Sequence, residues 1–494
     1  MGTDIDQESF QEADYAQFER RLQECLTTLG RLLERPGFGV GPVTLGAELE
    51  LFLVDAAARP LLGNQAVRAR TGDRRVTLEL DRFNLELNAT PTLLAGRPFT
   101  ALGEELRWLL DRVAAAAAEH GGRVALVGIL PTLRRPDLQP GVMTELPRYR
   151  ALDRGLRRLR QAPFHIRIAG PDPLELHSHD VALEGANTSF QVHLRVDPAA
   201  FARTYNAVQL ATAPVLAVAG NSPTFLGHRL WEETRVALCK QSIDDRDGRG
   251  LRRWLARVAF GTGWLREGPL ALFVEAVRLH RPLLPVLGDQ DPLAAGELGQ
   301  APPLAELRLH QGTVWRWNRP VYDPASGGHL RIEMRALPAG PTVVDMLANA
   351  AFLIGLSRWL ASEDERWTWR LSFERAEDGF YRAAQHGLAA ELTWPFGANG
   401  RLRTLSAAAL VPELLPAARE GLIGAGVAAP EADFLLGVIA ARVTSGQTGA
   451  VWQRRVLAAL EPQLGRERAL AAMLERYLAH AATDQPVHSW PTHP

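Results

Sequence analysis

The sequence predicts a large α+β domain in which antiparallel strands with one polar face are wrapped by helices. Three observations favour this fold class. Several segments alternate polar and apolar residues with the period of a strand, whereas longer segments carry apolar residues at helical spacing. The chain has 494 residues, 46% of them hydrophobic, which is enough for a large core. No internal repeat, heptad run or low-complexity linker divides it.

The first third of the chain is expected to alternate between helices and strands. Helices are indicated by apolar residues three or four positions apart and by terminal glycines or prolines, and strands by alternation. In order, the expected elements are a flexible tail over 1–15, a helix over 16–34, a strand over 44–54, two strand-like pieces within 76–88, a helix over 99–120 closed by two glycines, a buried strand over 124–130, a Pro-rich loop over 131–147 and a basic helix over 149–161.

The rest of the chain is expected to become increasingly helical. The elements are an alternating strand over 186–196, a helix over 198–219, a Pro/Gly-rich loop over 281–305, a strand over 329–336, a buried helix over 342–361 capped by Thr342, a helical C-terminal part over 366–481 and a flexible tail over 482–494. We therefore expect residues 16–481 to form a single large domain.

Charge and composition exclude several classes of function. The formal net charge is -1 and the isoelectric point is about 6.9, so a nucleic-acid-binding surface is not expected. Two cysteines give no disulfide framework, and the acidic N-terminus resembles no signal or transit peptide. The apolar stretch 343–356 is interrupted by Asp345 and Asn349 and is expected to be too short to span a bilayer. A cytoplasmic protein that uses no membrane is expected.

Two glutamates one residue apart are the most informative local feature. Glu48 and Glu50 lie in an otherwise apolar strand, so both side chains point to the same face. Solvated acids on an amphipathic strand would explain the pair simply. Buried carboxylates, however, are costly unless they are paired or bound to a cation, and the second interpretation is a divalent metal held by oxygen ligands.

Three further strands carry polar residues in the same alternating pattern. These residues are Glu79 and Glu86, Gln191 and His193, and Glu333 with Arg335. Carboxylates with one imidazole suit Mg²⁺ or Mn²⁺ better than zinc. Arginines beside such ligands suit phosphate, because the guanidinium group binds it with two parallel hydrogen bonds. The sequence therefore predicts a phosphoryl-transfer site on one face of the sheet, although it lacks the Gly-rich phosphate-binding motifs.

A set of short motifs occurs in a characteristic order. The motifs are Gly46-Ala-Glu-Leu-Glu50, Phe83-Asn-Leu-Glu-Leu-Asn-Ala-Thr-Pro91, Pro147-Arg-Tyr149, Gln191-Val-His193, Gly220-Asn-Ser-Pro223 and Arg331-Ile-Glu-Met-Arg335. Together, over about residues 40–360, they resemble the glutamate–cysteine ligase superfamily and its related carboxylate–amine ligases. The resemblance implies a glutamine-synthetase-like fold, with a curved, mainly antiparallel sheet that forms a funnel-shaped active site wrapped by helices.

The resemblance also implies an activity and a set of roles. Members activate a carboxylate as an acyl phosphate with ATP, and an amine then attacks it. The implied metal ligands are Glu48, Glu50, Glu79, Glu86, His193 and Glu333, with Asp81 as an alternative to Glu79. Arg335 is implied to stabilise the transferring phosphoryl group, Arg235 is implied to contact substrate or phosphate, and Arg148 and Gln191 are further residues implied for the ATP and substrate site.

The expected ligands and partners follow from this resemblance. They are Mg²⁺ or Mn²⁺, ATP as co-substrate, an amino-acid carboxylate and an amine, with no nucleic acid and no membrane; a homo-oligomer is compatible with the sequence. Glutamate and cysteine are one candidate substrate pair. Two alternatives remain: a nucleotide-binding regulatory homologue that has lost turnover, and a small-molecule kinase that uses the same site.

Overall fold

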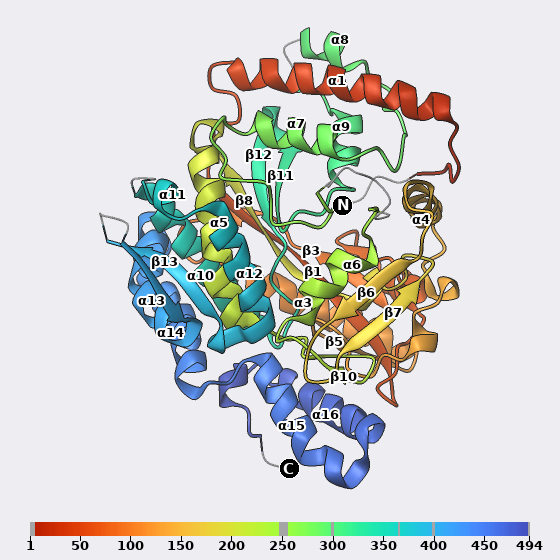
Figure 1. Cartoon of the computed structure of the whole chain (residues 1–494), viewed down its shortest axis with the longest axis vertical. Coiled ribbons are helices and arrows are strands. Elements are labelled where there is room, and N and C mark those ends of the chain that lie inside the picture. The colour runs from red at the N-terminus through yellow and green to blue at the C-terminus, as the bar shows by residue number, and fades with distance from the viewer. Residues whose placement is uncertain (1–4, 247–254, 298–300, 364–365, 398–400, 493–494) are drawn as a thin grey trace.

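The protein is built around one antiparallel sheet, seen at the centre of a computed structural model that describes residues 5–246, 255–297, 301–363, 366–397 and 401–492 (Figure 1). Its principal strands follow the order β11-β12-β8-β1-β3-β2, and β4 and β5 also pair with β1. The strands are β1 (Thr44–Asp55), β2 (Val76–Leu78), β3 (Asn84–Asn88), β4 (Thr92–Leu93), β5 (Gly122–Ala125), β8 (Phe190–Val196), β11 (Asn318–Asp323) and β12 (His329–Met334).

The long strand β1 holds the sheet together and separates its two faces. It pairs with four neighbours, all antiparallel. Leu45, Leu49, Leu51 and Leu53 are fully buried on its apolar face. This alternation is what the sequence predicted, and it leaves the opposite face to the polar residues.

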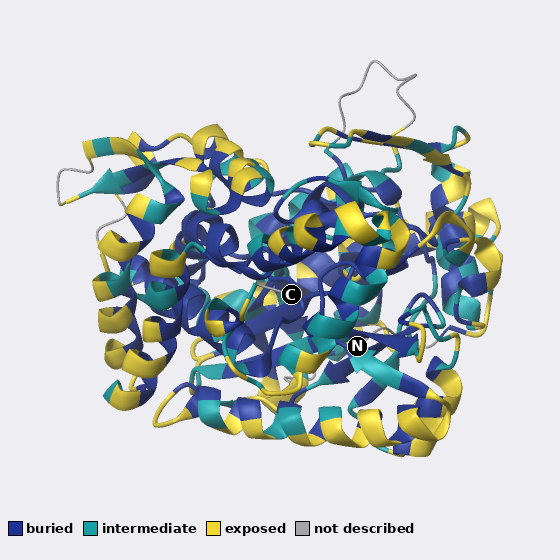
Figure 2. Ribbon diagram, turned by 90° about the horizontal axis from the view of Figure 1, so that it is seen from below, coloured by how far each residue is buried: buried dark blue, intermediate teal, exposed yellow. Residues whose placement is uncertain are grey.

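Helices cover the apolar side of the sheet in layers. The central helix α10 (Val343–Ser362) packs against α5 (Phe201–Ala219) and α13 (Ala407–Gly424), and α12 (Phe373–His386) packs on α5. Figure 2 shows this interior in dark blue, with exposed residues confined to the outer turns. Thr342 caps α10 as expected, since its Oγ1 accepts a hydrogen bond from the Asp345 amide at 3.1 Å.

Helix α10 is longer than the apolar stretch seen in the sequence. Its 20 residues are enough, by length and composition alone, to cross a membrane, which corrects the expectation that this stretch is too short. In the fold, 83% of its most apolar window is buried among other elements. Nearly every side chain along α10 is buried, as is typical of a core helix.

The two ends of the chain carry further helices. At one end, α1 (Glu12–Glu34) packs against α7 (Leu270–Leu279), α8 (Pro292–Glu297) and α9 (Ala305–Gln311). At the other, α15 (Gly449–Leu464) and α16 (Arg466–Ala481) form a hairpin below the sheet (Figure 1). The remaining helices are α2 (Asn64–Thr71), α3 (Pro98–Glu119), α4 (Pro147–Leu159), α6 (Thr234–Ser242), α11 (Trp367–Arg370) and α14 (Ala429–Ser445).

Both expected tails differ from what the sequence suggested. Helix α1 begins at Glu12, and Ile5 before it is buried. Near the C-terminus, Val487 and Trp490 are buried, and the Gln447 side chain donates hydrogen bonds to the carbonyls of both. Residues 1–4, 493 and 494 of these tails lie outside the described residues.

Three hairpins were not expected. They are β6 (Phe164–Ile168) with β7 (Leu174–Ser178), β9 (Thr224–Phe225) with β10 (His228–Arg229), and β13 (Glu391–Phe396) with β14 (Arg401–Ser406). The expected strand over 124–130 is shorter, ending at Ala125, and the expected loop over 281–305 contains the helix α8. The described antiparallel sheet and its helical layers confirm the α+β class.

Candidate active site

The register of the sheet gathers the polar residues on one face. Glu48 of β1 lies opposite Gln191 of β8, and Glu50 lies opposite Glu86 of β3. Cross-strand partners share a face, as do residues two apart on one strand. His193 of β8 is in turn opposite Glu333 of β12. A continuous polar surface therefore crosses β3, β1, β8 and β12.

Three of the predicted metal ligands come close enough to share an ion. One ligand atom each from Glu48, His193 and Glu333 lies within 4.8 Å of the other two. His193 Nε2 is 3.4 Å from Glu48 Oε1, and neither ring nitrogen of this buried histidine makes a hydrogen bond within the described parts of the chain. Two carboxylates and an imidazole fit Mg²⁺ or Mn²⁺, so the donor set matches the expected metal.

Glu333 is held between two arginines. Arg319 of β11 donates two hydrogen bonds to its carboxylate, one of them at 2.9 Å, and Arg335 Nη1 donates a third at 3.0 Å. Burial alone would raise the pKa of Glu333, but Arg319 and Arg335 outweigh it and lower the pKa to about 2. This carboxylate is therefore a permanent anion in the site.

Glu50 is fixed by donors from β8 and the residue before it. Its oxygens accept from the Ser189 amide at 2.7 Å and from Gln191 Nε2 at 2.9 Å. The other end of the Gln191 side chain accepts a hydrogen bond from Arg335. Gln191 therefore links Glu50 to Arg335 and orients both toward the same space. Burial, with Glu184 nearby, raises the pKa of Glu50 to about 7.

Glu86 forms the far end of the polar face. Its Oε1 accepts from Asn88 Nδ2 at 2.8 Å and from Thr77 Oγ1 at 3.0 Å. Burial and the nearby Glu48 raise the pKa of Glu86 to about 7. A bound cation would stabilise the anion of this buried acid in addition to these two donors, which again fits a metal.

Glu79 and Asp81, the two alternative metal ligands, have different surroundings in the structure. Both follow the end of β2, and burial raises both pKa values, with Glu86 adding to the effect at Glu79 and Glu184 at Asp81. The Asp81 carboxylate is fully buried against Gly185, where an added Cβ would lie 2.3 Å from its Oδ2. Of the two, Glu79 therefore has the position suited to the polar face, and its role as a ligand stays a prediction.

The remaining predicted arginines occupy different positions. Arg235 is buried at the start of α6, where its Nε donates to Glu233 at 3.1 Å and its Nη2 donates to the Ala336 carbonyl. It thus supports the backbone next to Arg335. Arg148 lies in the first turn of α4 over the ring of Tyr149, whose hydroxyl donates to the Leu78 carbonyl at 3.0 Å. This contact ties α4 to β2.

Two residues of the site were missed from the sequence. Arg319 reaches Glu333 only through the pairing of β11 with β12, a register that periodicity does not reveal. Glu184 lies in a short 3₁₀ turn (Glu184–Ala186) without periodic neighbours, and the charges of Arg335 and Arg235 act on it. No local pattern singles out Arg319, because Val321, the next residue on its face of the strand, is apolar.

Arg335 lies at the centre of the acidic face and keeps its charge. Burial would lower its pKa, but Glu333, Glu50 and Glu48 outweigh burial and raise it. The arrangement thus offers a cation of fixed position beside a set of oxygen ligands. Such a pair can hold a phosphate group from two sides.

Comparisons with known proteins identify the family of this chain. Glutamate–cysteine ligase family 2 (GCS2) matches residues 44–471. A glutamate–cysteine ligase of Haloquadratum walsbyi is 28% identical over 194 residues, which is 37% of this chain and 45% of that protein. A putative glutamate–cysteine ligase 2-2 of Mycolicibacterium vanbaalenii is 33% identical over 135 residues, covering 26% and 35%. The matched region thus spans less than half of each curated relative.

A solved structure shows the same fold at low identity. The glutamate–cysteine ligase of Francisella tularensis, in complex with AMP, superposes with a TM-score of 0.51 and 11% identity over 91% of this chain and 90% of that one. The expected glutamine-synthetase-like arrangement, with its curved antiparallel sheet, is therefore confirmed. Since the family matches most of the sequence, the chain belongs to glutamate–cysteine ligase family 2.

Proposed function

We propose that this protein is an ATP-dependent ligase that joins an amino-acid carboxylate to an amine through an acyl phosphate. The observation that carries the proposal is the juxtaposition of the Glu48, His193 and Glu333 ligand atoms with Arg335 on one sheet face. Family membership supports the same reaction class. Glutamate and cysteine are the substrate pair we propose first, because the curated relatives carry that name.

The acidic residues and His193 have one proposed role, as metal ligands, and Arg335 has another, as the contact of the phosphoryl group. Glu48, His193 and Glu333 would hold one divalent cation, and Glu50, Glu79 and Glu86 would supply oxygen ligands for more. A bound Mg²⁺ supplies charge neutralisation at the phosphates of ATP. Arg335, kept in place by Gln191 and Glu333, would stabilise the negative charge that develops on the transferred phosphoryl group.

The reaction needs no covalent intermediate on the enzyme. A carboxylate oxygen of the substrate attacks the γ-phosphorus, the bond to the ADP oxygen breaks, and the amine then displaces phosphate from the acyl carbon. The protein's part is to orient the carboxylate, exclude water and fix the cations. Arg319 contributes indirectly, because its two hydrogen bonds set the direction of the Glu333 carboxylate.

Product analysis tests this proposal. Purified protein is incubated with ATP, Mg²⁺ and pooled amino acids and amines, and ADP and products are identified by mass spectrometry. We expect ADP release that requires both a carboxylate and an amine, and its loss in Glu86→Gln. A stable phosphorylated product without an amine would instead indicate a small-molecule kinase. Nucleotide binding without turnover on any substrate would indicate a regulatory homologue.

A further inference from the structure

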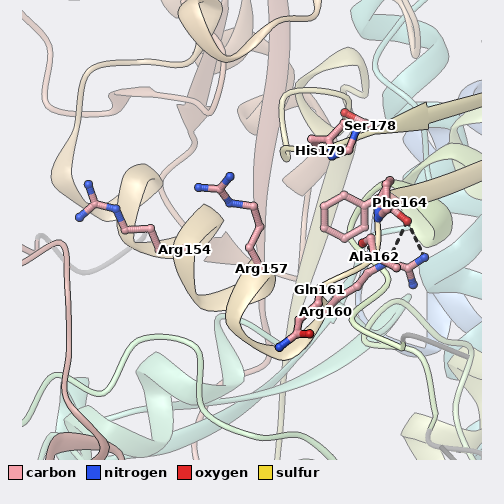
Figure 3. Close-up of a pocket in the computed structure, with 9 residues that line it drawn as sticks. Arg154, Arg157, Arg160, Gln161, Ala162, Phe164, Ser178 and His179 are labelled. Atoms are coloured by element: carbon pink, nitrogen blue, oxygen red, sulfur yellow. Dashed lines mark hydrogen bonds between the residues drawn. The ribbon is translucent and has the colours of Figure 1, made fainter. Parts of the chain in front are cut away.

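A cationic cavity lies outside the sheet face described above. It measures about 380 Å³, opens to the surface and is lined by the second half of α4 and by the β6–β7 hairpin. Its lining includes Arg154, Arg157, Arg160, Phe164, Ser178 and His179; in Figure 3 Arg154 and Arg157 lie on the helix, whereas Phe164, Ser178 and His179 lie on the side of the hairpin. None of the residues that line it belongs to the candidate active site.

The described lining of the cavity is basic and contains no acidic residue. Arg157 Nε reaches Asp153 at 3.0 Å on the same helix, and Arg154 Nη2 reaches Glu8 at 3.4 Å. About half of each of these two side chains is exposed, so neither guanidinium group is enclosed by its partner. Both can therefore turn donors toward a ligand at little cost.

Arg160 gives the cavity a fixed positive charge. Its guanidinium group donates to backbone carbonyls, including those of Ala162 and Pro163 at 3.1 Å and of Asp244 at 3.2 Å. Within the described chain its recorded hydrogen bonds go to carbonyls, which hold the group in place without neutralising it. The group also lies over the buried Phe164 ring, 5.5 Å from the centroid.

These features select a class of ligand. We propose that the cavity binds a small organic or inorganic oxyanion with at least two negative charges, carried on phosphate or carboxylate groups. Two adjustable guanidinium groups and one fixed one match the oxygens of such an anion. The volume suits a metabolite rather than a macromolecule.

The cavity adjoins two elements that lead to the candidate active site. The first turn of α4 contains Arg148 and Tyr149, and the Tyr149 hydroxyl donates a hydrogen bond to the Leu78 carbonyl of β2. The segment after β7 leads from His179 to Glu184, which lies near Arg335. A ligand in the cavity would therefore contact both the helix and the segment that bound one side of the site.

Calorimetric titration of the full-length protein tests the proposal. Inorganic phosphate and succinate are titrated separately at constant ionic strength, with chloride as the reference anion. We expect saturable binding of at least one of them, weakened about tenfold or more in Arg157→Gln and further in Arg157→Glu. Whichever of the two anions binds more tightly identifies phosphate or carboxylate as the preferred group.

Matched variants locate the binding. Arg158→Gln removes the same charge from α4 but not from the cavity lining, and it should bind like the unmodified protein. Arg335→Gln, on the sheet face, should retain the binding that Arg157→Gln weakens. Absence of saturable binding by the unmodified protein, equal binding in Arg157→Gln, or loss of binding in Arg335→Gln alone would overturn the proposal. Circular dichroism of each variant confirms that it is folded.

Discussion

At the scale of single residues, the candidate site is defined by how each charge is held. Glu333 has three donors, Glu50 has two, and Gln191 joins Glu50 to Arg335. These contacts set the directions of the acids before any ligand binds, which is the preorganisation that charge stabilisation in a transition state requires.

Arg335→Ala should lower turnover by about 10²–10³-fold, because a positioned cation of this kind stabilises developing charge by a few kcal/mol. The loss should appear in kcat more than in KM, as measured by steady-state ADP release. Arg331→Ala is the matched control. Arg331 lies on the neighbouring strand β12, and its Nη1 pairs with Asp323 Oδ2 at 3.3 Å, outside the candidate site. Equal turnover in Arg335→Ala and the unmodified protein would remove Arg335 from the mechanism.

Glu79 and Asp81 should respond differently to loss of charge. Burial against Gly185 raises the pKa of Asp81, so Asp81→Asn replaces a protonated acid by a neutral isostere and should leave the Mg²⁺ dependence of turnover unchanged. Glu79→Gln should raise the Mg²⁺ concentration needed for half-maximal activity by about tenfold, since it removes a proposed ligand. The reverse pattern would make Asp81 the ligand.

At the scale of elements, strand periodicity predicted the strands of the central sheet better than it predicted the hairpins outside that sheet. In β1 and β8 every second residue is apolar and buried, so alternation predicted both the strands and their polar face. The β6–β7 hairpin was missed because its two short strands are separated by Pro and Gly residues within a loop-like composition. Arg319 was missed for another reason, since strand pairing is a long-range property.

A buried ion pair ties α10 to α14 and to the C-terminal segment. Arg442 Nη2 lies 2.7 Å from Asp345 Oδ1, and the Val487 amide donates to Asp345 Oδ2 at 3.0 Å. Asp345→Asn should lower the free energy of unfolding by about 3–5 kcal/mol, because it leaves the buried guanidinium without its counter-charge.

Urea unfolding measures this loss of stability. Asp433→Asn is the control, because Asp433 forms an exposed pair with Arg419 on α13 and should change stability by less than about 1 kcal/mol. Equal effects of the two substitutions would show that the buried pair does not hold these helices together.

At the scale of the whole molecule, one apolar cluster extends from Ile5 to Trp490 and joins the helical layers to the sheet. A single large domain, expected from composition and from the absence of linkers, stays a prediction. The packing of residues 487–490 was not predicted, because a Pro- and His-rich stretch has no periodicity and its contacts come from distant helices.

Acid should destabilise the fold through two buried histidines, His280 at the end of α7 and His310 on α9. Burial lowers the pKa of His280 to about 2 and that of His310 to about 4. The unfolded chain binds protons at these residues below about pH 6.5, whereas the folded protein does not, so stability present above that pH is lost as the pH falls. Each histidine should cost about 2 kcal/mol by pH 5.

Chemical denaturation at pH 7 and pH 5 measures this dependence. His280→Gln should flatten the decline, and His120→Gln, at an exposed position, should leave it unchanged. A decline of the same steepness in His280→Gln would show that this histidine does not resist protonation in the fold.

The central claim is that the sheet face activates a carboxylate as an acyl phosphate. The most direct test uses glutamate labelled with ¹⁸O in its carboxylates, together with cysteine, ATP and Mg²⁺, and mass spectrometry of the released phosphate. The proposed reaction transfers one labelled oxygen from the carboxylate to each phosphate formed. Peptide formation with unlabelled phosphate would contradict the claim.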